Sequence, residues 1–166
     1  MALRVELSCL AFLMSLLVSF AAMANSQQCQ YVVRVKTGDR RSAGTDSMIS
    51  LKLMASNGNS FTVNNLEGWG IMGPGHEYFE RGNLDVFSGK ATCVNVCAIT
   101  VTSNGAGYKP GWYLDYIEIT VSGGVSKNVK FPVNQWLALD ERPHHLYADV
   151  NLCPRFGGLE PILSYV

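Results

Sequence analysis

Three acidic residues have the chemistry to bind a hard cation. Asp39, Asp46 and Asp85, with the amide oxygen of Asn104 or loop carbonyls, could supply the roughly six to eight oxygen ligands that calcium takes. The alternative is that Asp46, in the turn-like sequence GTDS, accepts hydrogen bonds from nearby backbone amides. No D-x-D-x-D-G loop is present. Calcium is therefore one candidate ligand, but no feature of the sequence makes a cofactor necessary.

Four cysteines follow an apolar N-terminal segment: Cys29, Cys93, Cys97 and Cys153. An even number in an oxidising compartment indicates disulfides, with three ways of pairing them. The short spacing of Cys93 and Cys97 suggests a local bridge, which would leave Cys29 and Cys153 to join the first strand to the last. A zinc site is the rival, but a C-x3-C pair without a second ligand motif gives it weak support.

Several segments approach catalytic motifs without completing them. Residues 68–73 match G-x-G-x-x-G, but Pro and Gly follow where the phosphate-binding helix should begin. In HEYFE, residues 76–80, Glu80 replaces the second histidine of a zinc protease motif. His144 and His145 open an expected strand and would point to opposite faces of it. We therefore expect no catalytic residues and a protein that is not an enzyme.

The apolar segment from Leu7 to Ala24 predicts a signal peptide over residues 1–24, cleaved after Ala22-Met23-Ala24. The protein is then expected in the secretory pathway, either outside the cell or in the endoplasmic reticulum. Residues 25–166 suit a single domain with its core over 29–154 and a short tail over 155–166. The formal net charge of the chain is zero, which argues against a nucleic-acid partner.

Strand-like runs are separated by turn residues throughout the chain. Ile49, Leu51 and Leu53 alternate with other residues at the period of a half-buried strand, and Asn57-Gly58 is a hairpin turn signal. No stretch of residues 25–166 keeps a helical period over three turns. An all-β sandwich or barrel is indicated, with strands over 29–37, 46–56, 60–65, 83–88, 95–103, 112–121, 127–134 and 144–152.

The segment GWYLDYIEITV, residues 111–121, has apolar side chains of both parities. Trp112 and Leu114 would face one side of a plain strand, and Ile117 and Ile119 the other. One extra residue near Asp115-Tyr116 would place all of them on the core face, which predicts a β-bulge and a buried Trp112.

Three segments in this order and spacing resemble the PLAT/LH2 domain: YVVRVKTGDRRSAGTDSMISLKL, YFERGNLDVFSG and GWYLDYIEITV. The segments CQYVV, ATCVNVCAITVTSNGAGYKPGW, QWLAL and NLCP are similar to secreted single-domain plant PLAT proteins linked to stress responses and the endoplasmic reticulum. The resemblance implies a β-sandwich of two four-stranded antiparallel sheets. It also implies a non-catalytic role in binding lipid, membrane or protein, with calcium bound by loop acids in some members.

If each strand runs opposite to its predecessor, the loops 38–45, 66–81, 104–111 and 135–143 meet at one end of the sandwich. Apolar tips beside cations suit a membrane interface. Trp69 is the leading candidate for insertion, and the alternative is that its long loop folds back and buries its own side chains. The expected contact set is Trp69, Ile71, Met72, Tyr108, Trp136, Arg40, Arg41 and Lys109, with Arg142 nearby.

The sequence thus predicts a module that binds lipid or membrane surfaces, without catalysis and without a transmembrane span after processing. The alternative is a protein-interaction module that recruits a lipid-metabolising enzyme or another partner through the same loops.

Overall fold

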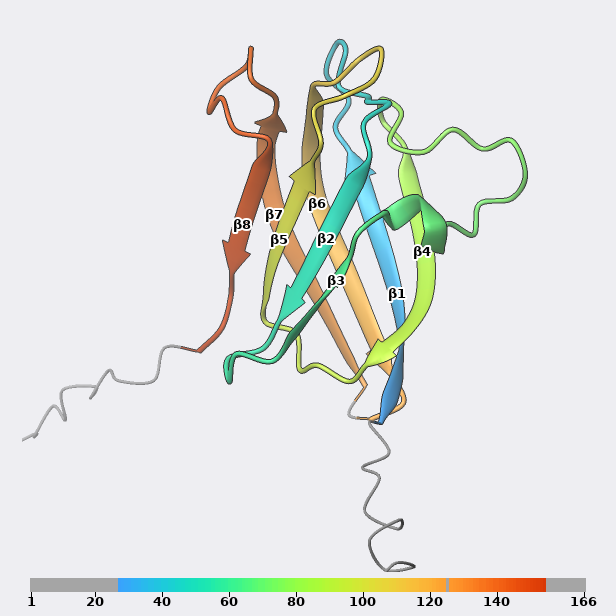
Figure 1. Cartoon of the computed structure of the whole chain (residues 1–166), viewed down its shortest axis with the longest axis vertical. Coiled ribbons are helices and arrows are strands. Elements are labelled where there is room, and N and C mark those ends of the chain that lie inside the picture. Colours follow the sequence, from blue (N-terminus) through green and yellow to red (C-terminus); the bar gives the residue numbers. More distant parts are fainter. Residues whose placement is uncertain (1–26, 125, 155–166) are drawn as a thin grey trace, which may run out of the picture.

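The computed structural model of the chain describes residues 27–124 and 126–154. The predicted signal peptide, residues 1–24, and the predicted tail, residues 155–166, lie outside these ranges. Within the described ranges, no helix is long and apolar enough to cross a membrane. The described chain folds into β-strands joined by loops, with a single turn of 3-10 helix (Figure 1).

Two four-stranded antiparallel sheets pack face to face, which confirms the predicted fold class (Figure 1). The strand order is β4-β1-β6-β7 in the first sheet and β3-β2-β5-β8 in the second. Apolar residues of both sheets fill the space between them. The elements are β1 (Gln28–Thr37), β2 (Ile49–Met54), β3 (Ser60–Val63), η1 (Leu66–Trp69), β4 (Leu84–Thr92), β5 (Ala98–Ser103), β6 (Trp112–Ser122), β7 (Lys127–Leu137) and β8 (Tyr147–Asn151).

Each predicted strand is present, but several ends differ. β4 runs past the predicted end at Ser88 to Thr92, because it pairs with β1 along its whole length. β7 likewise continues to Leu137, which pairs with Trp112 of β6. β2 and β8 begin later than predicted. The residues before them belong to loops, so the expectation that His144 and His145 lie in a strand is wrong.

β6 has the bulge that its sequence predicts. Two consecutive residues of β1, Lys36 and Thr37, pair with Tyr116 and Leu114, and Asp115 is left without a partner. Because of this extra residue, the large apolar side chains on both sides of it reach the core. Trp112 is fully buried and its Nε1 donates to Thr37 Oγ1 at 3.0 Å, so its polar edge is satisfied. The fully buried apolar residues of β6 are Trp112, Leu114, Ile117 and Ile119.

The four cysteines form two disulfides, Cys29–Cys93 and Cys97–Cys153. The suggested pairing of Cys93 with Cys97 and of Cys29 with Cys153 is wrong. The loop between Cys93 and Cys97 passes from one sheet to the other, so each of these cysteines bonds within its own sheet. Each disulfide instead joins the ends of two neighbouring strands: β1 and β4 in the first sheet, β5 and β8 in the second. The bridges close loops with sequence separations of 64 and 56 residues. Loop-closure entropy predicts about 4 kcal/mol of stabilisation from each.

Candidate functional site

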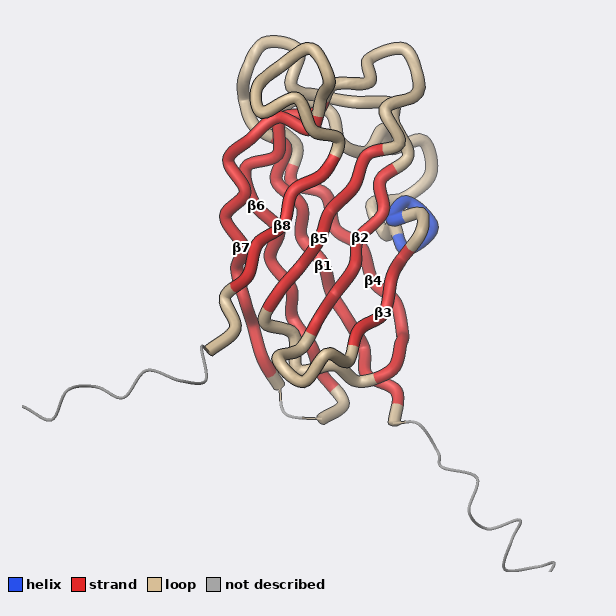
Figure 2. The backbone as a smooth tube through the Cα atoms, turned by 60° about the vertical axis from the view of Figure 1, so that its left-hand side comes forward, coloured by secondary structure: helices blue, strands red, loops and turns tan. Residues whose placement is uncertain are grey.

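Loops that are distant in sequence lie together at one end of the sandwich (Figure 2). This arrangement follows from the antiparallel order of the strands. We call three of these connections the pole loops: residues 38–48, 104–111 and 138–146. The remaining connection, residues 64–83, contains η1, which lies along the side of the sandwich rather than at its tip (Figure 2).

Buried hydroxyl groups hold two of the pole loops together. Thr45 Oγ1 donates to the carbonyl of Lys109 at 2.8 Å, and Ser47 Oγ donates to the carbonyl of Ala106 at 2.6 Å. Both hydroxyl-bearing residues are buried. The amide of Tyr113 in β6 donates to the carbonyl of Ala43 at 3.0 Å, which attaches the first loop to the sheet. The first two pole loops, residues 38–48 and 104–111, are therefore anchored to each other and to β6.

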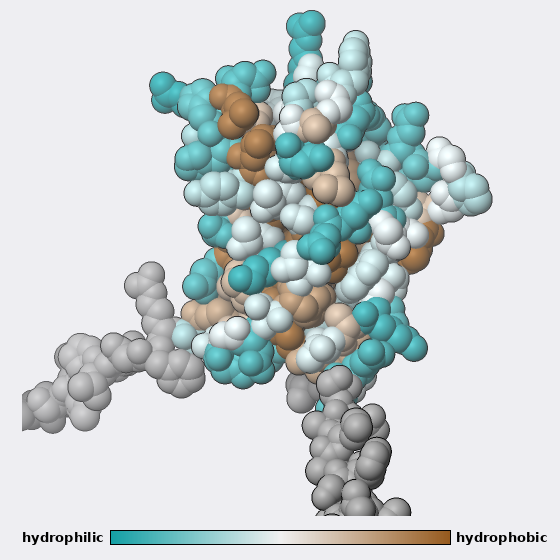
Figure 3. All heavy atoms as spheres, viewed as in Figure 1, coloured by the Kyte–Doolittle hydropathy of each residue, from teal (hydrophilic) through white to brown (hydrophobic). Residues whose placement is uncertain are grey.

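Large apolar side chains project from the pole loops. Tyr108 is 86% exposed and Leu139 is 68% exposed, the two highest values among the large apolar residues described. Met48 is half exposed on the neighbouring loop. In Figure 3, hydrophobic residues form separate spots on the visible face, with one of them at this end above β8. Exposed apolar side chains at one end of a domain are suited to contact with another apolar surface.

The charges of the pole loops cancel. Arg40, Arg41, Lys109 and Arg142 are balanced by Asp39, Asp46, Asp140 and Glu141, four cations against four carboxylates. All eight residues are exposed. The pole therefore has charged groups for local hydrogen bonds, but no net field to attract an anionic or cationic surface from a distance.

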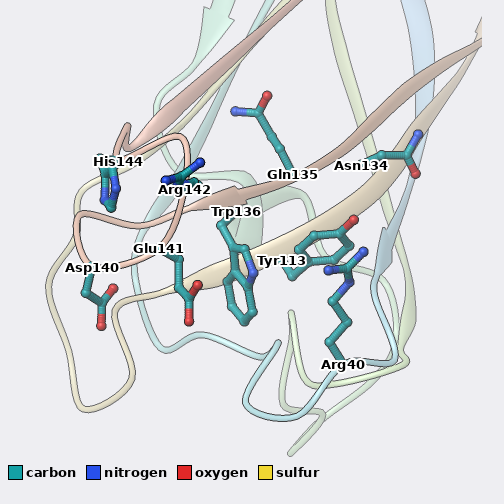
Figure 4. Close-up of a pocket in the computed structure, with 9 residues that line it drawn as sticks. All are labelled: Arg40, Tyr113, Asn134, Gln135, Trp136, Asp140, Glu141, Arg142 and His144. Atoms are coloured by element: carbon teal, nitrogen blue, oxygen red, sulfur yellow. The ribbon is translucent and has the colours of Figure 1, made fainter.

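An aromatic pair with a cation on top forms one side of the pole. The Arg40 guanidinium carbon lies 3.9 Å from the centre of the Tyr113 ring. On the adjacent strand, Trp136 packs edge-to-face against Tyr113, with ring centres 5.3 Å apart. These three residues line a depression of 590 Å³ that also includes Asp140 and Glu141 (Figure 4). Trp136 was among the predicted contact residues, whereas Tyr113 was missed because its pairing with Trp136 depends on strand register.

Trp69 lies in η1 and is half-buried against the core. A Cβ added at Gly89 of β4 would lie 2.3 Å from its indole carbons, so the ring packs directly on the backbone of that strand. Phe61 lies on another side, with ring centres 6.3 Å apart. The loop thus folds back onto the sheet, and Trp69 is placed away from the pole loops.

Ile71 and Met72 are 58% and 41% exposed. The backbone amide of Ile71 donates to the carbonyl of Val86, and Gly70 forms a bridge with Phe87, so the segment lines the open edge of β4. These side chains are exposed, but they belong to the side of the sandwich.

The four predicted calcium ligands have other partners or lie alone. Asp85 is fully buried, and its two oxygens contact the amide of Phe79 and the ring of His76. Asn104 Oδ1 accepts from the backbone amides of Met48 and Ala106. Asp39 pairs with Arg81 at 2.7 Å, and Asp46 is exposed. In the described ranges, no group of three or more His, Cys, Asp or Glu residues could hold a metal ion. These residues do not fit a calcium site.

The sequence does not predict the contact between His76 and Asp85. His76 Nε2 lies 2.6 Å from Asp85 Oδ1. Asp85 Oδ2 accepts from the Phe79 amide at 2.7 Å. The buried carboxylate thereby ties the connection 64–83 to β4. The alternating pattern of β4 places Asp85 on the core face with Phe87. This is the only signal in the sequence that Asp85 is a buried anchor for the connection.

The fold is a β-sandwich domain of the type found in lipoxygenases. A coral 8R-lipoxygenase, described as activated by calcium through a C2-like domain, matches with a TM-score of 0.57 at 24% identity. The match covers 74% of this chain and 16% of the lipoxygenase chain. The likeness at this identity shows the fold alone.

The family model of the PLAT/LH2 domain matches residues 31–148, and the chain belongs to this family. PLAT domain-containing protein 2 of Arabidopsis thaliana is 46% identical over 143 residues, which cover 82% of this chain and 78% of the relative. PLAT domain-containing protein 1 of the same plant is 42% identical over 147 residues, covering 84% of this chain and 81% of the relative. These relatives support the resemblance to the plant single-domain group.

Proposed function

We propose that this protein is a non-enzymatic module of the secretory pathway that binds lipid or membrane surfaces through its pole loops. In a plant, the family resemblance implies that it acts in stress responses. The observation that carries the proposal is the exposure of Tyr108 and Leu139 beside Arg40, Arg41 and Lys109 on one end of the domain. The two disulfides support an oxidising compartment.

Insertion of the apolar tips would supply most of the binding energy. Full burial of a large apolar side chain is worth about 1.5–3 kcal/mol, which corresponds to roughly tenfold to a hundredfold in affinity. Leu139 suits the acyl boundary. Tyr108 suits the headgroup level, because its ring is apolar and its hydroxyl is polar. Arg40 and Arg41 would then meet phosphate or carbonyl oxygens of the lipids.

The balanced charges of the pole loops predict how vesicle binding depends on salt. Polybasic surfaces bind anionic lipids by long-range attraction, which salt screens. This pole has equal numbers of cations and carboxylates, so insertion rather than attraction should dominate. Vesicle binding is therefore expected to change little, by about threefold or less, when the salt concentration rises from low to physiological values.

Sedimentation with phosphatidylcholine vesicles tests the proposal. The double variant Tyr108→Ser, Leu139→Ser should bind at least about tenfold more weakly than the wild type, because both insertion groups are lost. The matched control is Ile71→Ser, Met72→Ser, which removes two exposed apolar residues from the β4 edge. This control should bind like the wild type. Equal binding by all three proteins, or a loss confined to the control, would remove the pole loops from the contact surface.

Trp69 and calcium have no part in this proposal. The indole of Trp69 packs on Gly89. The two oxygens of Asp85 contact the Phe79 amide and the His76 ring, and Asn104 Oδ1 accepts from backbone amides. For Trp69 or a calcium ion to act at the pole loops, these side chains would have to leave their present contacts.

A second candidate function is the recruitment of a protein partner by the same loops. The observation that favours it is the match to a lipoxygenase, in which a domain of this fold forms part of an enzyme's own chain. A separate domain of this kind could instead associate with its enzyme. Pull-down from tissue extract with the wild type and the Tyr108→Ser, Leu139→Ser variant separates the two functions. Capture of a lipid-metabolising enzyme by the wild type but not by the variant, with no vesicle binding by the wild type, would favour this second function.

A further inference from the structure

Trp136 stands at the boundary between two depressions of the pole. The larger has a volume of 590 Å³ and the smaller a volume of 190 Å³. Trp136, Asp140 and Glu141 line both of them (Figure 4 shows the larger). The larger volume falls within the range of about 300–1,000 Å³ typical of small-molecule sites. A ligand seated at this boundary would contact an aromatic ring and two carboxylates together.

The charges that line the larger depression are balanced, and Lys109 adds one more cation on the side of the smaller depression. Arg40 and Arg142 supply two positive charges to the larger depression, and Asp140 and Glu141 supply two negative charges. Within residues 27–124 and 126–154, the only ion pairs are His76 with Asp85 and Arg81 with Asp39, so none of these four groups is paired. Figure 4 shows Glu141 beside the indole and Arg40 beside the Tyr113 ring.

This combination selects for a neutral ligand rich in hydroxyl groups. The two carboxylates disfavour a phosphate, and the two guanidinium groups disfavour an ammonium ion. A hydroxyl group can donate to a carboxylate and accept from a guanidinium, and such charge-assisted hydrogen bonds are the stronger kind. The C–H groups on one face of a sugar ring carry partial positive charge, which the negative face of an indole attracts.

Residues that line the two depressions have positive φ angles, which are uncommon for residues other than glycine. In the described ranges, four residues other than glycine have positive φ angles: Ser42, Phe79, Asn134 and His144. Asn134 (φ 51°) and His144 (φ 66°) line the larger depression, and Ser42 (φ 60°) lines the smaller. Such conformations persist only where the surrounding structure enforces them, and they are concentrated at binding sites.

The irregularity of β6 and β7 contributes to the same site. Where Asp115 bulges from β6, two residues of β7, Val133 and Asn134, lie between the pairs Tyr116–Pro132 and Leu114–Gln135. Beyond this point Trp136 pairs with Tyr113. Bulges next to binding sites commonly re-aim side chains in this way.

We propose that Trp136, with Asp140, Glu141, Arg40 and Arg142, binds a neutral sugar ring. On a lipid surface the source of this ring is the headgroup of a glycolipid, and in solution it is a free sugar. The inference deepens the proposed function, on which its membrane form rests: Tyr108 and Leu139 would insert into the surface while the Trp136 site selects the headgroup.

The test uses the full mature protein and three probes: phosphatidylcholine vesicles, the same vesicles containing digalactosyl diacylglycerol, and a soluble galactose disaccharide. The wild type should bind the galactolipid vesicles at least about tenfold more tightly than the plain ones, as an aromatic contact and charge-assisted hydrogen bonds together allow. The disaccharide at millimolar concentration should remove this excess. Equal binding of the wild type to both kinds of vesicle, with no binding of the disaccharide, would overturn the inference.

Two variants and a control make the result specific. Trp136→Ala should lose the extra affinity for galactolipid vesicles and should bind plain vesicles like the wild type. Asp140→Asn with Glu141→Gln should do the same without touching the ring packing, which covers the case in which the Trp136 variant fails to fold. The control Tyr108→Ser, Leu139→Ser should bind each kind of vesicle at least about tenfold more weakly than the wild type does, and should still bind the disaccharide. If the wild type binds the disaccharide but no vesicles, the membrane function fails and the sugar site stands.

Discussion

The indole of Trp69 lies against the backbone of Gly89 so closely that no side chain fits at position 89. A Cβ there would come within 2.3 Å of the ring. Gly89→Ala should therefore displace the indole and lower the free energy of unfolding by about 1–3 kcal/mol, as overpacked positions do. Urea denaturation measures this. Gly68→Ala is the matched control, because nothing lies within 4 Å of a Cβ at that position. Similar stability of both variants would contradict the packing.

Replacement of the Trp69 side chain should affect the stability of the domain rather than lipid binding. Trp69→Ala removes a half-buried side chain from the outside of the core and should cost about 2 kcal/mol in the free energy of unfolding. Binding to phosphatidylcholine vesicles, measured by sedimentation, should stay at the wild-type level. A variant with normal stability and lost vesicle binding would return Trp69 to the contact surface.

The disulfide pairing can be checked directly and by stability. A proteolytic digest of the non-reduced protein should yield linked peptides containing Cys29 with Cys93 and Cys97 with Cys153. The double variant Cys97→Ser, Cys153→Ser should unfold with about 4 kcal/mol less free energy, since a loop with a separation of 56 residues is released. A linked Cys93–Cys97 peptide in the digest would disprove the pairing.

Asp85 should be far more important for stability than the exposed acid Asp39. Asp85 is fully buried, and its removal leaves the Phe79 amide and His76 without their acceptor. Asp85→Ala should cost about 2–4 kcal/mol and speed hydrogen exchange of the Phe79 amide. Asp39→Ala breaks only an exposed pair with Arg81 and should cost about 1 kcal/mol or less. Slow exchange at Phe79 in the Asp85 variant would show that another group satisfies this amide.

Tyr31 links stability to alkaline pH. Burial raises the pKa of its hydroxyl above the ordinary value of 10.0, while the hydrogen bond from Val94 acts in the opposite direction. The unfolded chain thus releases this proton at a lower pH than the folded chain, so stability is full below pH 10.0 and falls as the pH rises through the folded pKa. The hydroxyl also donates to the carbonyl of Thr92.

Tyr31→Phe leaves the Thr92 carbonyl and the Val94 amide without this partner, which should cost about 1–3 kcal/mol at neutral pH. The difference from the wild type should narrow above pH 10.0, because the variant has no proton to release at this position. Denaturant unfolding at several pH values measures both effects. Tyr108→Phe, at an exposed ring, is the control. A difference that stays constant across the alkaline range would contradict the linkage.

Local patterns were sufficient to predict the strands and the bulge at Asp115, since each depends on alternation within one segment. These patterns left a sandwich or a barrel open, and the resemblance to the PLAT/LH2 domain was needed to predict the two four-stranded sheets. Disulfide pairing was not predictable in this way, because it depends on which strands become neighbours. The position of Trp69 depended on Gly89, whose missing side chain makes room for the ring and carries no signal of its own. The site at Trp136 depends on cross-strand register and on loop backbone angles, which a single sequence does not reveal.

Both covalent bridges lie at the end of the sandwich opposite the pole loops, where the described chain also begins and ends (Figure 1). A tag, a fusion partner or a link to a sensor chip attached at either point would stand at the far side of the domain. The pole loops would then face outward, so immobilised protein can be offered to vesicles and sugars without steric interference from its own attachment.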